Sequence, residues 1–121
     1  MKILIKYKLP GEKGQRERTI SLHKAESQII QVLMDNGPMF GEELKTHMAP
    51  HHKLQDTRRR LEGLLPGIFH TIHIDRNSVL YYLMGQEDEA RKLLGRKGAG
   101  KACYKAIEEQ GHLHWDYEAQ R

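Results

Sequence analysis

Residues 37–65 read GPMFGEELKTHMAPHHKLQDTRRRLEGLL, and this stretch decides which fold the chain adopts. Leu44 and Met48 are one helical turn apart, which predicts a short helix over 42–48, and Pro50 closes it. After a tight turn, a second series of apolar residues at helical spacing predicts a longer helix over 52–65, which Pro66-Gly67 ends. Two helices of unequal length therefore follow one another with only a few residues between them.

The elements on either side of this helix pair extend the pattern. Upstream, the spacing of apolar residues from Lys24 predicts a helix that ends before Asp35-Asn36-Gly37-Pro38, and Met39-Phe40 forms a short apolar connector. Downstream, residues 68–74 alternate in the manner of a strand, residues 79–84 are rich in β-forming side chains, and residues 75–78 supply a turn. The predicted order is helix, connector, short helix, longer helix and hairpin.

This order resembles the winged helix-turn-helix superfamily of bacterial and phage regulators. The resemblance covers about residues 24–84 and rests on the segment from Gly37 to Leu44, on residues 56–65 and on the hairpin that ends at residues 79–83. Pro50 in the turn and the length of segment 51–65 depart from the usual pattern. The resemblance implies a three-helix core with a β-hairpin wing, and DNA binding through the third helix.

The rest of the chain flanks this region on both sides. Residues 2–9 and 18–22 alternate apolar and polar side chains around a turn at 10–14, which predicts an N-terminal hairpin. Residues 88–94 and 101–110 have helical patterns, and 112–117 fits a short strand or a docking segment. The chain is thus expected to be α+β, with a hairpin at 1–22, a winged helix-turn-helix domain at 23–85 and a mostly helical tail at 86–121.

The third predicted helix carries the candidate binding residues. With 100° per residue, Leu54, Thr57, Leu61, Leu64 and Leu65 share one face, which we expect to be buried. The opposite face holds the candidates for reading base edges, which are His52, Gln55, Asp56 and Arg59. Arginine pairs with guanine, glutamine with adenine, and a carboxylate accepts a hydrogen bond from cytosine. Three flanking basic residues are assigned to phosphate, namely Lys53, Arg58 and Arg60.

The tip of the predicted wing is a weaker signal. Arg76-Asn77 fits a contact with the minor groove or with phosphate, and it fits an ordinary four-residue turn equally well.

The distribution of charge favours a polyanionic partner. The net charge is +4, and residues 51–60 hold four basic side chains against Asp56, whereas residues 25–50 hold four acidic side chains against one lysine. An acidic second helix beside a basic third helix favours DNA binding over the alternative, a solvated helix on a winged helix that binds protein. Residues 91–105 add six basic side chains and no acid.

Other kinds of chemistry have weaker signals. Residues 95–101 match the spacing of a phosphate-binding loop that ends in Lys101, but Ala102 stands where a magnesium-binding hydroxyl is required, so a basic linker is the better interpretation. A metal-responsive regulator stays a lesser alternative. The loosely spaced residues that raise it are His47, His51, His52, His112, His114 and Cys103. No catalytic arrangement stands out, so we expect no enzyme, no cofactor and no metal.

The expected partner is double-stranded DNA, bound by a homodimer that reads two half-sites. The contact between protomers is assigned to the hairpin or to the tail, where Trp115 and Tyr117 are candidate anchors. One cysteine and the absence of a long apolar segment predict a cytoplasmic protein without a membrane partner. A transcriptional regulator or an accessory factor of a phage or mobile element fits these features.

Overall fold

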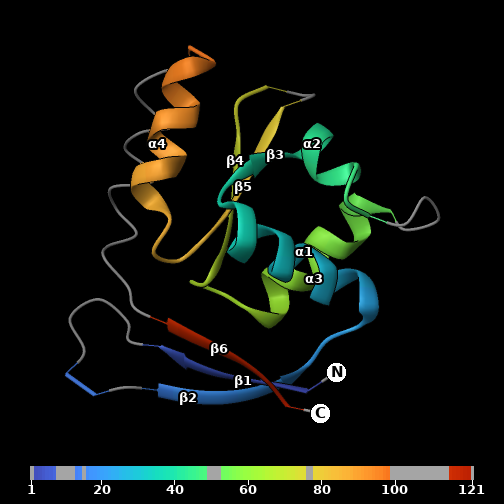
Figure 1. Ribbon diagram of the computed structural model, residues 1–121, viewed down its shortest axis with the longest axis vertical. Helices are drawn as coiled ribbons and strands as arrows, with labels where there is room; N and C mark the ends of the chain where they lie inside the picture. The colour runs from blue at the N-terminus through green and yellow to red at the C-terminus, as the bar shows by residue number, and fades with distance from the viewer. Residues whose placement is uncertain are drawn as a thin grey trace.

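The computed structural model describes residues 2–7, 13–14, 16–48, 53–75, 78–98 and 115–120. In this part of the chain the architecture is α+β, with four helices and two antiparallel sheets of three strands each. Figure 1 shows one sheet beneath the helices α1 and α3 and the other sheet between these helices and α4. None of the helices among the described residues is long and apolar enough to cross a membrane.

The lower sheet joins the two ends of the described chain. It consists of β1 (Lys2–Tyr7), β2 (Arg16–Ser21) and β6 (Trp115–Gln120), in the order β2-β1-β6. The antiparallel pairing of β1 with β2 is the hairpin that the alternating residues predict, and Ile3 is paired with both Ile20 and Ala119. The segment expected at 112–117 as a strand or a docking segment overlaps β6 at 115–117, and the backbone of β6 pairs with β1. The helix expected over 101–110 lies outside the described residues.

Helix α1 (Lys24–Asn36) follows directly from this sheet. The backbone N–H of His23 donates to Glu26 Oε1 at 3.0 Å, which satisfies one of the free donors at the start of the helix. The stripe of Ile29, Ile30 and Leu33 is fully buried. Gly37 ends the helix with φ +83°, and its N–H donates to Leu33 O at 2.9 Å, a conformation that glycine adopts without steric cost.

The segment that decides the fold forms the expected elements with shorter helices. They are β3 (Met39–Phe40), α2 (Gly41–Lys45), α3 (Leu54–Leu64), β4 (Phe69–His73) and β5 (Val79–Leu83), and the sheet order is β3-β5-β4. The second helix, expected to reach Met48, ends at Lys45. A tighter turn follows, in which the Thr46 and Met48 amides each donate to the carbonyl three residues earlier. Helix α3 begins two residues later than expected, after Lys53.

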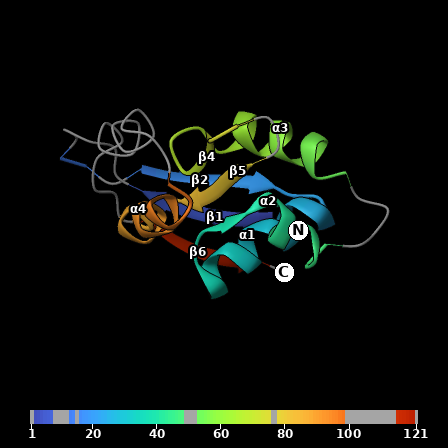
Figure 2. The same ribbon diagram turned by 90° about the horizontal axis from the view of Figure 1, so that it is seen from above.

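The upper sheet is buried on both faces. Phe69, Tyr81 and Leu83 pack into the core with α1 and α3, whereas Ile72, Leu80 and Tyr82 face a second cluster with Ala90 and Leu94 of α4 (Glu87–Arg96). Seen from above, α3 and α4 lie on different sides of β4 and β5 (Figure 2).

Helix α4 corrects the expectation for the start of the tail. It is longer than the predicted 88–94, and Gly95 and Arg96, expected in a basic linker, form its last turn. Lys97 lies over the ring of Phe40 at 5.1 Å from the centroid, so the end of α4 is attached to the sheet through a cation–π contact. Residues 87–97 are therefore an integral part of the packed domain.

Candidate nucleic-acid interface

The orientation of α3 follows from the side chains that anchor it. Leu54, Thr57 and Leu61 are buried, and Leu61 is fully inaccessible, as the helical spacing predicts. The Thr57 hydroxyl donates to Lys53 O at 3.0 Å, which fastens the first turn. Since a helix turns 100° per residue, burial of this stripe directs the intervening residues outward.

The outward face of α3 contains three of the four residues assigned to base reading. Gln55, Asp56 and Arg59 are all exposed, and the fourth, His52, lies outside the described residues. Lys53, assigned to phosphate, is exposed at the start of the same helix. Within the described ranges, the side chains of Gln55 and Arg59 have no hydrogen-bond or ion-pair partner. Their polar groups are thus available to a ligand.

Arg58 is directed toward the sheet and away from solvent. Its side chain is only 14% exposed, its Nε lies 3.8 Å from Glu62 Oε1, and its Nη1 donates to His73 Nε2 at 3.4 Å. Glu62 also accepts a hydrogen bond from the Thr71 hydroxyl at 3.0 Å. This network joins α3 to β4. Arg58 is assigned to phosphate from the sequence, but its guanidinium would have to leave these partners to reach a phosphate.

Tyr81 of β5 belongs to the same network. Burial raises the pKa of its phenol above the ordinary value, and the charge and hydrogen bond of Arg58 oppose this rise. Arg58 of α3 therefore interacts with both strands of the hairpin, β4 through His73 and β5 through Tyr81.

Arg60 is engaged on the opposite side of α3. Its Nε lies 2.6 Å from Glu26 Oε2, and the side chains of Arg60 and Glu26 are 45% and 3% exposed. Sequence reasoning assigned Arg60 to phosphate and missed Glu26. The glutamate three residues after His23 is a signal of a helix start, but its burial depends on the packing of α1 against α3. A phosphate at Arg60 would compete with a carboxylate that the guanidinium already neutralises.

The turn between β4 and β5 is closed at its base. Ile74 N–H donates to Ser78 O, and Ser78 N–H donates to Asp75 Oδ1, both at 2.9 Å. Arg76 and Asn77, the candidate wing contacts, lie outside the described residues.

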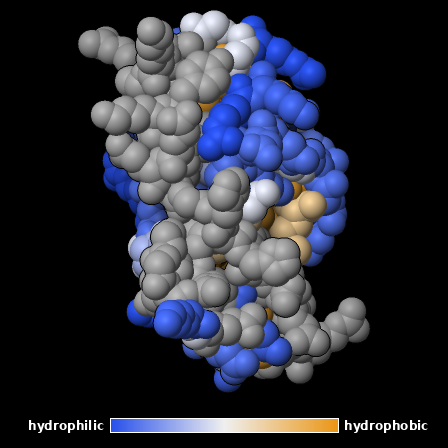
Figure 3. All heavy atoms as spheres, turned by 90° about the vertical axis from the view of Figure 1, so that its left-hand side faces the viewer, coloured by the Kyte–Doolittle hydropathy of each residue, from blue (hydrophilic) through white to orange (hydrophobic). Residues whose placement is uncertain are grey.

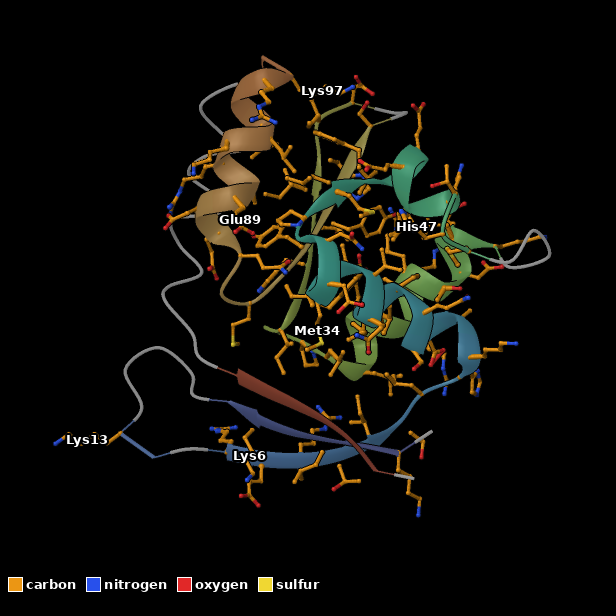
Figure 4. All side chains as sticks on the ribbon, viewed as in Figure 1. Lys6, Lys13, Met34, His47, Glu89 and Lys97 are labelled. Atoms are coloured by element: carbon orange, nitrogen blue, oxygen red, sulfur yellow. The ribbon has the colours of Figure 1, made fainter. Side chains whose placement is uncertain are left out.

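The basic segments of the sequence are spread over the molecule. Lys13, in the hairpin region, and Lys97, at the end of α4, lie at opposite ends of the long axis (Figure 4). Glu42 and Glu43 are exposed on α2, so the acidic helix expected before α3 is present as an exposed surface. Among the described residues of α3 and its N-cap, Lys53 and Arg59 are the basic side chains without an ion-pair partner.

The metal reading gains no support from the described ranges, where no group of three or more metal-binding side chains occurs. His47 lies on the side of the molecule away from Glu89 of α4 (Figure 4). The other candidates, at positions 51, 52, 103, 112 and 114, and Lys101 of the loop-like motif are outside the described residues.

His70 of β4 lies on the α4 side of the sheet. Its ring stacks on Tyr82 with centroids 5.1 Å apart, and its Nε2–H donates to Gly67 O at 2.9 Å. Burial lowers the pKa of His70 below its ordinary 6.5, and the hydrogen bond to Gly67 and the charge of Glu87 oppose this shift. His70 is therefore a structural side chain, remote from the outward face of α3.

An open hollow lies between the end of α1 and α4. Its lining combines the apolar Met34 and Leu93 with the charged Asp35, Glu89 and Lys92. On the side of the molecule where α4 lies, the described residues are mostly hydrophilic, with a small hydrophobic area (Figure 3). With charges of both signs around an open rim, this hollow selects no particular ligand.

No protein-family model, curated protein or solved structure matches this chain. The outward face of α3 is therefore the candidate site on geometric grounds. Gln55 and Arg59, which have no partner among the described residues, lie there beside Asp56 on one helix whose opposite face is buried.

Proposed function

We propose that the chain is a winged helix-turn-helix protein that binds double-stranded DNA, with α3 in the major groove. Support for the fold comes from the element order α1-β3-α2-α3-β4-β5 and from the sheet order β3-β5-β4. In this arrangement α1 and α2 support α3, and β4 and β5 form the wing.

The observation that carries the DNA-binding proposal is the outward row of Gln55, Asp56 and Arg59. The width of the major groove admits one helix, and these side chains match the donor and acceptor patterns of adenine, cytosine and guanine. Lys53, at the start of the helix, is the phosphate contact, because a lysine positions the helix without reading sequence. Arg76 and Asn77 remain the proposed contacts of the wing.

The biological role that this activity fits is transcriptional regulation, or an accessory function in a phage or mobile element. A single α3 offers few base contacts, so we propose a homodimer that binds two half-sites.

A second candidate function, binding of another protein, is favoured by one observation. Glu42 and Glu43 are exposed on α2, next to α3 in the chain, and carboxylates repel phosphate. A winged helix that uses this surface would dock a basic partner. Its complex would lack the steep salt dependence that release of counterions from DNA produces.

Selection from random duplexes, followed by binding measurements, tests the proposal. We expect enrichment of one motif. Arg59→Ala should weaken binding to that motif by about 1–3 kcal/mol and change binding to random duplex much less. Lys53→Ala should weaken both alike and lower the salt slope by about one unit. Arg96→Ala on α4 is the matched control for loss of an exposed arginine. Failure to enrich any motif would count against base reading.

A further inference from the structure

Gly63 is the second-last residue of α3. It belongs to the helix, is exposed, and does not have a positive φ. The glycine with a left-handed backbone at this end of the helix is Gly67, with φ +82°, and the helix has already ended there. Glycine is a poor helix residue because its unfolded backbone has more freedom than that of alanine. The local conformation therefore gives no reason for glycine at position 63.

Packing gives no reason for glycine either. A Cβ built on Gly63 meets no atom within 4 Å, whereas the same construction on Gly41 meets the Tyr81 ring at 3.2 Å. Gly41 thus makes room for a neighbour inside the fold. Gly63 leaves an open place on the surface that the described residues do not fill.

The open place lies on the face proposed to enter the groove. Gly63 follows Arg59 by one turn and Asp56 by two turns, so the three residues form one row along the outside of α3. The adjacent Glu62 is held by the Thr71 hydroxyl and Arg58, which keeps its carboxylate on the β4 side.

From these observations we infer that Gly63 is a point of close approach between the α3 backbone and the wall of the DNA groove. This inference rests on the proposed function. The missing side chain lets the C-terminal half of α3 settle deeply enough for Arg59 to reach a base edge. Glycine is the residue that proteins use where a backbone must come close to a ligand.

Two substitutions test the inference in the full chain. Gly63→Ala should raise the melting temperature by about 2–5 °C, because alanine favours the helix and has space. The same change should weaken binding to the selected duplex by about fivefold, since a methyl group then separates the helix from the groove. Gly63→Gln, with a longer side chain at the same place, should weaken binding by more than about twentyfold.

Gly95→Ala is the matched control, because Gly95 is also exposed, helical and without a positive φ, but lies in α4. It should leave the affinity for the selected duplex unchanged. Arg59→Ala, measured in parallel, separates the two proposals. If Arg59→Ala loses the motif while both Gly63 variants bind like the parent protein, DNA binding stands and the inference at Gly63 is overturned. If the parent protein binds no duplex, both are overturned.

Discussion

Three consecutive arginines on α3 have three different environments. Arg58 contacts His73 and Glu62, Arg59 faces solvent, and Arg60 pairs with the buried Glu26. Because each step along a helix rotates the side chain by 100°, neighbours of equal charge take on separate tasks. The helical phase predicts the exposure of Arg59, but the partners of the other two come from β4 and α1 and are not visible in the local pattern.

Arg60→Ala should destabilise the protein by about 1–3 kcal/mol, since it removes the guanidinium from a buried carboxylate that keeps only its contacts with His23. Lys53→Ala, which removes an exposed charge at the start of the same helix, should change the free energy of unfolding by less than about 0.5 kcal/mol. Urea unfolding measures both. Adding Glu26→Gln to Arg60→Ala should recover part of the loss, because it removes the buried charge. Equal stability of the Arg60→Ala and Lys53→Ala proteins would mean that the ion pair between Arg60 and Glu26 contributes nothing to stability.

The lowered pKa of His70 predicts a dependence of stability on pH. The native state takes up a proton at His70 less readily than the unfolded chain does, so the stabilisation present at neutral pH is lost as the pH falls through 6.5. The stability difference between the parent protein and His70→Asn should therefore shrink or reverse between about pH 7.5 and pH 5. Parallel profiles of the two proteins would show that His70 titrates alike in both states.

At the scale of elements, the periodicity of apolar residues predicts local structure and leaves long-range contacts undetermined. The stripe of Leu54 and Leu61 predicts the buried face of α3, and the alternation at 68–74 predicts a strand, which the structure has as β4. The periodicity of apolar residues does not predict which element α4 packs against. Its apolar residues predict a helix, but only the structure shows that the helix covers the second face of β4 and β5.

Leu94→Ala tests whether α4 is part of the core. The side chain is fully buried, so its truncation should cost about 2–5 kcal/mol. Lys92→Ala, two residues earlier on the exposed side, should have little effect. Thermal unfolding of both variants decides the matter. A Leu94→Ala protein as stable as the parent would show that α4 is not part of the core.

At the scale of the whole molecule, β1 lies in the middle of its sheet, between β2 and β6. Removal of residues 115–121 would leave the β6 side of β1 without its backbone partner. Since an open strand edge is a template for other strands, we expect the shortened protein to melt at a lower temperature and to associate. Light scattering after size-exclusion chromatography measures the association. A truncated protein with the melting temperature and the oligomeric state of the parent would show that β6 is dispensable.

The pairing of β1 with β6 also has a consequence during synthesis. During translation β1 and β2 are synthesised one after the other, whereas β6 is synthesised only after the four described helices and the strands of the second sheet. Until β6 has been synthesised, one edge of β1 has no backbone partner within its sheet. The β6 side of β1 is therefore paired only after every other described element has been synthesised.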